Sequence, residues 1–265
     1  MRKYLFLLLS ICAVIISCKK HVDIASDKIV TTPLSEADFN ANYLSAHNNG
    51  NFNIWVQGLT SLNAQGNPVH NNSFLINGMF YDKYDSIIMG GVVNIDTFSF
   101  HAANTYLIQK PLADSSFFGR NIAVNLTPPN GQAPKFSTNI YLPKIVYAQL
   151  GSATANILQP VSDTIFWNAD GNNINGIDVT ISYDPSSYNN KNILGYFPSP
   201  VTKTIASVRD NGVFVIPQDV TTLFPVGAFL NISLSRGAAV LISYNEFKYT
   251  VHTYSYAFIS NAKFP

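Results

Sequence analysis

Residues 176–183 read Gly-Ile-Asp-Val-Thr-Ile-Ser-Tyr, and this stretch decides the fold class. Its larger apolar side chains fall at every second position, at Ile177, Val179, Ile181 and Tyr183. Successive side chains of a β-strand point to opposite faces, whereas a helix would repeat every three to four residues. The alternation therefore predicts a strand with one buried face.

Similar short runs, separated by turn residues, continue on both sides of this strand. They cover residues 52–59, 73–80, 92–100, 105–109, 121–126, 138–142, 163–167, 212–216, 227–234, 239–244 and 249–259. Turn-forming sequences accompany them, among them Gly66-Asn67-Pro68, Asn77-Gly78 and Pro128-Pro129-Asn130-Gly131. We therefore expect an all-β protein.

The composition supports this expectation. Of 265 residues, 47% are hydrophobic, 13% are aromatic and only 12% are charged, which argues against a disordered chain or a coiled coil. Only Glu36 and Glu246 are glutamates, so the chain is poor in a residue that builds surface helices. Sixteen Lys and Arg against fifteen Asp and Glu give a net charge of +1, which argues against nucleic acid as a partner.

A change of composition divides the chain into two parts. Residues 143–160 contain Pro143, Gly151, Pro160 and a run of small residues, which is typical of a domain junction. We expect two β-sandwich domains, at residues 36–150 and 151–265. One short helix is predicted over 36–46, because Ser35-Glu36-Ala37-Asp38 has the spacing of a capping box.

The second part carries a resemblance to a known fold. It has a Trp in an early strand (Trp167), a Tyr that closes the next strand (Tyr183), and a Pro-Xaa-Gly turn at 225–227 that enters a late strand. In this order it resembles a fibronectin type III or immunoglobulin-like sandwich over about residues 160–265. The resemblance implies a fold and no common chemistry. We expect Trp167 to pack in the core of this domain.

The first eighteen residues have the pattern of a secretory signal. Met1-Arg2-Lys3 precedes an apolar run over 4–16, which is too short to span a membrane. The run ends in Ile15-Ile16-Ser17-Cys18, which resembles the lipobox of bacterial lipoproteins. The resemblance implies that 1–17 is a cleaved signal peptide and that Cys18 is lipidated. The alternative is a soluble secreted protein in which Cys18 is an ordinary residue.

The residues after Cys18 bear on the compartment. Cys12 lies inside the signal, so Cys18 would be the only cysteine of the mature chain. Residues 18–35 lack a sustained period and suit a tether. In bacterial lipoproteins, an Asp directly after the lipidated Cys marks retention in the inner membrane, and here this position is Lys19. The chain resembles outer-membrane lipoproteins of Bacteroidota. The resemblance implies an outer-membrane protein held by its lipid, and leaves open whether the body faces the periplasm or the medium.

Motifs for catalysis or for a cofactor are missing from the sequence. The five histidines show neither an HxH nor an HExxH spacing, and a Gly-x-Ser-x-Gly sequence and a phosphate loop are absent. The acids stand mostly beside Gly, Asn, Ser or Pro, where they form turns. We therefore expect no catalytic residue, no metal and no cofactor. A zinc site assembled from distant strands stays open as an alternative.

The segment 168–175, Asn-Ala-Asp-Gly-Asn-Asn-Ile-Asn, is dense in side-chain oxygens. Its spacing does not fit the EF-hand loop, because Phe166 stands where the first ligand would be. We expect a turn between two strands, and a calcium site is the alternative.

The longest irregular stretch, 184–203, supplies candidate binding residues. It contains Tyr188, Tyr196 and Phe197, whose rings would stack on sugars if exposed, with nearby amides such as Asn190 bonding to hydroxyl groups. The alternative is that residues 196–198 fold back to cap the sandwich. Residues 81–84, Tyr-Asp-Lys-Tyr, are a weaker candidate of the same type.

Two tripeptides, Asp85-Ser86-Ile87 and Asp163-Thr164-Ile165, are similar to the signal for protein O-glycosylation in Bacteroidota. The resemblance implies Ser86 and Thr164 as candidate sites.

These patterns together favour a lipid-anchored protein of the cell envelope that acts as a non-enzymatic binding or structural module, with glycan or protein as partner. The alternative is an envelope hydrolase with its site in the first domain. An exposed aromatic platform without a pair of carboxyl groups would favour binding. A pocket that holds two acids, or a His and an Asp, would favour the enzyme.

Overall fold

The computed structural model describes residues 28–34, 48–62, 68–82, 84–102, 105–108, 117–131, 133–151, 164–191 and 199–263. It is mostly β, with 61% strand, and the described part contains one short α-helix, α3 (Gln218–Thr221). The prediction of a mostly β protein is therefore confirmed. The helix predicted over 36–46 lies outside the described residues.

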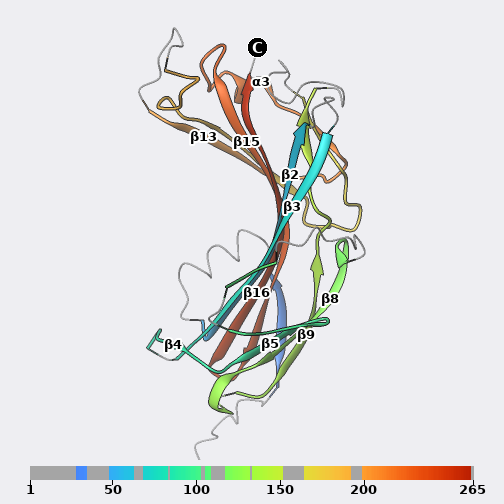
Figure 1. Cartoon of the computed structure of the whole chain (residues 1–265), viewed down its shortest axis with the longest axis vertical. Helices are drawn as coiled ribbons and strands as arrows, with labels where there is room; N and C mark the ends of the chain where they lie inside the picture. Colours follow the sequence, from blue (N-terminus) through green and yellow to red (C-terminus); the bar gives the residue numbers. More distant parts are fainter. Residues whose placement is uncertain are drawn as a thin grey trace, which may run out of the picture.

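A nine-stranded sheet runs the length of the molecule (Figure 1). Its order is β13 (Val201–Val208), β12 (Ile177–Tyr183), β15 (Phe229–Tyr244), β16 (Phe247–Lys263), β2 (Gly50–Leu62), β3 (Pro68–Tyr81) and β4 (Ile87–Ile88), with β1 (Val30–Leu34) on β15 and β7 (Thr105–Ile108) on β3. The long strands β15 and β16 are joined by a tight turn at Asn245 and Glu246. β16 and β2 pair in parallel, and the other pairs are antiparallel.

Two smaller sheets cover one face of the long sheet. A four-stranded sheet, with β6 (Phe98–His101), β5 (Val92–Ile95), β8 (Arg120–Thr127) and β9 (Phe136–Leu142), packs on one half. A three-stranded sheet, with β10 (Ala148–Leu150), β11 (Thr164–Trp167) and β14 (Val213–Val215), packs on the other half. The result is two hydrophobic cores under one continuous sheet.

Both cores receive residues from the same strand. In β16, Tyr249 and Val251 are buried in the first core, whereas Ala257 and Ile259 are buried in the second. The long sheet takes strands from both 36–150 and 151–265. Whether these two ranges fold as separate domains stays a prediction.

Residues 143–147, which we call the crossing segment, pass from β9 to β10 close above the long sheet. A Cβ on Gly58 would lie only 1.9 Å from the carbonyl oxygen of Val146. The backbone N–H of Val146 also donates a hydrogen bond to Ser255 Oγ at 2.8 Å. Only small side chains fit beneath the crossing segment.

A buried ion pair lies beside the crossing segment. Arg236 Nη1 and Asp210 Oδ2 are 2.9 Å apart, and both side chains are almost fully buried. Arg236 also donates to the carbonyl oxygens of Lys144, Ile145 and Asn168. The ion pair therefore joins segments that are far apart in the sequence.

Three local expectations can be compared with the structure. Trp167 is buried in the second core, as expected, and its Nε1 donates to Asp210 at 2.8 Å. The turn expected at Asn77-Gly78 is wrong, because both residues lie inside β3, where Gly78 leaves room for the ring of Phe52. The last part of the expected tether, Val30–Leu34, forms the strand β1 instead.

Candidate functional site

The long sheet has a second face, which points away from the two small sheets. This face lies on the concave side of the curved molecule (Figure 1). The inward positions of β2 are Phe52, Ile54 and Val56, so Trp55 projects from the second face. In β16 the same alternation places His252, Tyr254, Tyr256 and Phe258 there. We call Trp55 and these four residues the aromatic strip.

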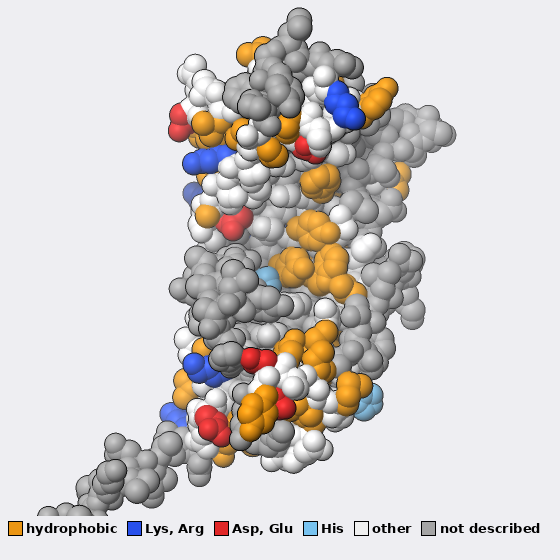
Figure 2. All heavy atoms as spheres, turned by 90° about the vertical axis from the view of Figure 1, so that its left-hand side faces the viewer, with side chains coloured by type: hydrophobic (Ala, Val, Ile, Leu, Met, Phe, Trp, Pro, Cys, Tyr) orange, Lys and Arg blue, Asp and Glu red, His pale blue; other side chains and the backbone are white. Residues whose placement is uncertain are grey.

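Four rings of the aromatic strip, those of Trp55, His252, Tyr254 and Tyr256, contact one another. Tyr254 stands opposite Trp55 in the parallel pair, and their ring centroids are 5.8 Å apart with planes within 3° of parallel. Trp55 and Tyr256 are 5.6 Å apart, and His252 and Tyr254 are 4.8 Å apart. Hydrophobic side chains gather in the middle of this face (Figure 2). These contacts hold the four rings in a fixed arrangement.

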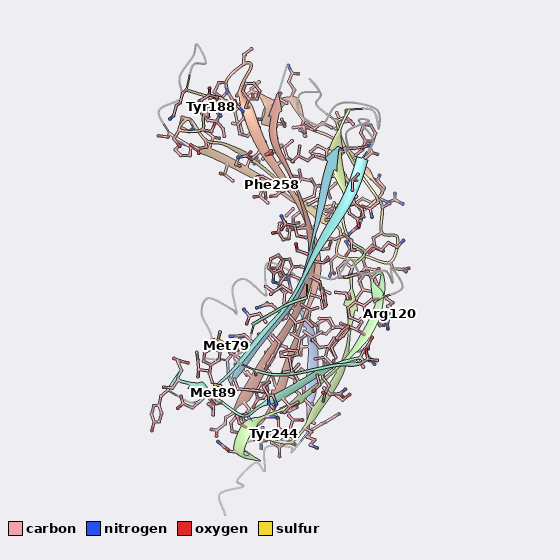
Figure 3. All side chains as sticks on the ribbon, in the orientation of Figure 1. Met79, Met89, Arg120, Tyr188, Tyr244 and Phe258 are labelled. Atoms are coloured by element: carbon pink, nitrogen blue, oxygen red, sulfur yellow. The ribbon has the colours of Figure 1, made fainter. Side chains whose placement is uncertain are left out.

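Exposure changes along the strip. His252 is buried, Trp55, Tyr254 and Tyr256 are half-buried, and Phe258 is 46% exposed. Figure 3 shows Phe258 on the concave side of the sheet. Burial raises the pKa of Tyr256 above that of an exposed tyrosine. Its hydroxyl group is protonated at neutral pH, as in any tyrosine, and can donate a hydrogen bond.

Hydroxyl and amide side chains border the strip. Ser235 stands opposite Tyr256 and Ser233 opposite Phe258 on β15, and Asn53 and Gln57 stand opposite His252 and Tyr256 on β2.

The acid Asp178 on β12 stands opposite Ser235 of β15. Its Oδ1 accepts a hydrogen bond from the backbone N–H of Ser207. In the described part of this face, the rings therefore lie among neutral polar groups and not beside a pair of carboxylates.

A glycine keeps space beside the rings. Gly237 stands opposite Tyr254. A Cβ there would lie 2.6 Å from the carbonyl oxygen of Thr253 and 3.3 Å from His252 Nε2. Any larger residue at this position would push His252 and Tyr254 out of place.

Of the three aromatic residues predicted from the sequence, the structure describes Tyr188. Tyr188 is 88% exposed and lies near one end of the molecule, away from the aromatic strip (Figure 3). Tyr196 and Phe197 lie outside the described residues. Asn190 is buried, and its side chain exchanges hydrogen bonds with the backbone of Phe229, so it is not available to a sugar.

The remaining predicted sites are accessible to different degrees. Ser86 is exposed after a turn, and Tyr84 beside it is 75% exposed. Thr164 begins β11 and is half-buried, opposite Val215. Cys18 lies outside the described residues. O-glycosylation and lipidation stay predictions.

The oxygen-rich segment 168–175 forms turns between β11 and β12, as expected. The carboxylate of Asp170 is buried and accepts hydrogen bonds from the Tyr141 hydroxyl group at 2.7 Å and from the Lys144 backbone N–H at 2.9 Å. The described ranges contain no group of three or more His, Cys, Asp or Glu side chains that could hold a metal ion. In the same ranges, no helix has the length and apolar character needed to cross a membrane.

No protein-family model matches the chain, and a search of curated proteins finds no significant match.

Proposed function

We propose that the protein is a non-enzymatic binding module of the bacterial cell envelope, and that the aromatic strip binds glycan chains. The observation that carries the proposal is the strip itself: four rings in mutual contact and an exposed fifth ring, Phe258, on the sheet face opposite the two small sheets, bordered by neutral hydroxyl and amide groups.

Glycans match both parts of this surface. A sugar ring has an apolar C–H face and a rim of hydroxyl groups. Tyr and Trp offer a rigid apolar surface with a polar end, while Ser, Asn and Gln both donate and accept hydrogen bonds. The strip extends from residue 252 to 258 along β16, about 20 Å at the usual rise of a strand. A surface of this length suits a chain of sugars better than a single unit.

The compartment belongs to the same proposal. A lipid on Cys18 would hold the protein at the outer membrane, within reach of envelope glycans. Replacing Cys18 with Ser should move the protein from the detergent phase to the aqueous phase in a partition experiment. Unchanged partition would refute the anchor without affecting the strip.

The test of glycan binding compares two exposed aromatic sites. The purified chain is passed over insoluble polysaccharides, including chitin, cellulose, xylan and peptidoglycan, and the retained fraction is measured. The variant Tyr256→Ala with Phe258→Ala should lose most retention, because each aromatic contact contributes about 0.5–1.5 kcal/mol. Together this is a loss of about tenfold or more in affinity.

The matched control is Tyr188→Ala, which removes the more exposed ring at the other site. It should retain the binding of the parent. Loss of binding in Tyr188→Ala, with the strip variant unaffected, would move the site to the 184–191 loop. Retention of the parent on none of these polysaccharides would refute glycan binding.

A further inference from the structure

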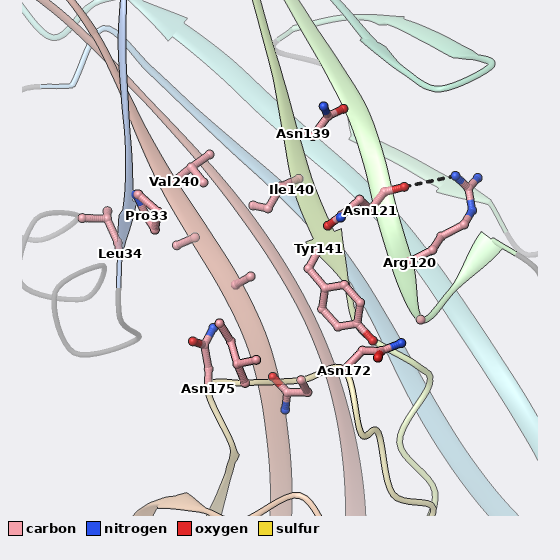
Figure 4. Close-up of a pocket in the computed structure, with 15 residues that line it drawn as sticks. Pro33, Leu34, Arg120, Asn121, Asn139, Ile140, Tyr141, Asn172, Asn175 and Val240 are labelled. Atoms are coloured by element: carbon pink, nitrogen blue, oxygen red, sulfur yellow. Dashed lines mark hydrogen bonds between the residues drawn. The ribbon is translucent and has the colours of Figure 1, made fainter.

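A second site lies away from the aromatic strip, on the side where the sheets are layered. It is a pocket of about 550 Å³ (Figure 4). Its walls come from β1 and β15 on one side and from β8 and β9 on the other, and residues 172–175 of the turn lie below. The volume is in the range of small-molecule sites.

Asparagine side chains from separate elements surround the pocket. Asn121 on β8 and Asn139 on β9 come from the four-stranded sheet, and Asn172 and Asn175 come from the turn. Asn175 Nδ2 donates to the carbonyl oxygen of Gly237 at 2.8 Å, which fixes the turn against β15. This bond joins the floor of the pocket to the wall formed by β15.

Tyr141 provides a rigid wall. It stands opposite Asn121 in the β8–β9 pair, and its ring points towards the turn that carries Asn172 (Figure 4). Its hydroxyl group donates to buried Asp170. Burial and this hydrogen bond raise the pKa of Tyr141 well above its ordinary value. The hydrogen bond to Asp170 orients the ring.

The pocket has no uncompensated charge among its described lining residues. Arg120 forms an ion pair with Asp96 and donates to the carbonyl oxygen of Asn121. Ile140 and Val240 add apolar surface. The ligand that fits is therefore neutral, with groups that both donate and accept hydrogen bonds and with some apolar surface.

We propose that this pocket binds a short neutral saccharide of one or two sugar units. Each sugar hydroxyl group both donates and accepts, and each asparagine amide offers both a donor and an acceptor in return. The wall of Tyr141 offers a flat surface to the C–H face of a sugar. The proposal rests on the pocket alone and does not depend on the aromatic strip.

The experiment uses the purified full chain and two-dimensional NMR of its side-chain amides. The probes are the methyl glycosides of glucose, galactose, mannose and N-acetylglucosamine, and the disaccharides maltose and cellobiose. At least one probe should shift the amides of Asn139 and Asn172. The variant Asn139→Ala with Asn172→Ala should bind this probe at least about tenfold more weakly, because two neutral hydrogen bonds are lost.

Two controls separate this site from others. Asn125→Ala removes an amide from β8 outside the pocket and should bind as the parent does. The strip variant, Tyr256→Ala with Phe258→Ala, should also keep this binding, so the two sites fail independently. The double asparagine substitution lies at exposed positions, and the backbone NMR spectrum verifies that the variant is folded.

Three results would overturn the proposal. The first is that none of the sugars shifts these amides. The second is equal binding by the double asparagine variant. The third is preference for a neutral extended peptide, acetyl-Gly-Ser-Thr-Asn-Gly-Ser-amide, over every sugar, which would assign the pocket to a protein segment.

Discussion

Two arginines show how burial changes the contribution of an ion pair to the free energy of unfolding. Arg236 is fully buried against Asp210, whereas the side chain of Arg120 is 46% exposed in its pair with Asp96. Arg236→Ala leaves the charge of Asp210 buried without its partner, which costs about 3–5 kcal/mol. Arg120→Ala removes an exposed pair, which costs about 0–1 kcal/mol. Urea unfolding of both variants measures the difference.

The comparison is informative because the same substitution is made at both positions. Arg236 also donates to three carbonyl oxygens beside the crossing segment, so its loss should loosen the contact between the two small sheets. If the two variants were equally stable, the Arg236 pair would not hold these segments together.

Tyr249 gives a prediction on pH. Burial raises the pKa of Tyr249 to about 12, against about 10 in an unfolded chain. Below pH 10 the residue is protonated in both states, so its contribution to stability is fully present. Between pH 10 and 12 only the unfolded state loses the proton, and the folded state loses this contribution.

The measurement is the free energy of unfolding of the parent and of Tyr249→Phe between pH 8 and 12. The decline above pH 10 should be less steep in the variant, because one titrating group has been removed. Parallel curves would show that Tyr249 ionises as readily in the folded protein as in the unfolded chain.

Among the elements, the sequence predicts strands well and their arrangement poorly. The alternation at 177–183 corresponds to β12, and the run at 121–126 lies inside β8. Alternation is a local signal, so it identifies strands. It does not show that β2 pairs in parallel with β16, about 200 residues away, or that one sheet lies beneath two cores.

The aromatic strip was missed for a physical reason. Along β16, aromatic rings alternate with Thr253, Ser255 and Ala257, and hydrophobicity alone would place the rings inside. The structure buries the small residues instead, because the crossing segment lies too close to the sheet for anything larger. The sequence pattern predicts an exposed aromatic platform in the 184–203 loop, whereas the structure brings rings together on β2 and β16.

The strand β1 should be the least stable element of the long sheet. It pairs with β15 along five residues, and four of its side chains are exposed. By contrast, Thr250 and Thr253 of β16 are buried between two paired strands. Main-chain hydrogen bonds that are not covered by packed side chains open readily.

Hydrogen exchange followed by mass spectrometry measures this difference. The amides of residues 30–32 and 34 should exchange at least about a hundredfold faster than those at 250–255, which open only with the core. Residue 33 is a proline and has no amide hydrogen. Equal protection would mean that β1 opens only together with the rest of the sheet.

At the scale of the whole molecule, the long strands decide how the protein unfolds. β15 and β16 pass through both cores, so neither core is complete without them. Cutting the chain near residue 150 would separate β16 from β2 and the first core from Val240 and Tyr249. We therefore expect that residues 151–265 alone do not fold to a stable unit.

The two tryptophans make this expectation measurable. Trp55 is on β2, whose neighbouring residues Ile54 and Val56 belong to the first core, and Trp167 is in the second core. Trp167→Phe leaves Trp55 as the only reporter, and Trp55→Phe leaves Trp167.

In each variant, the midpoint of urea unfolding by fluorescence should equal the midpoint by far-ultraviolet circular dichroism, as a single cooperative transition requires. Because both probes are read on the same variant, a change of stability caused by the substitution shifts them together. Two separated midpoints would show instead that 36–150 and 151–265 unfold independently, in spite of the sheet that they share.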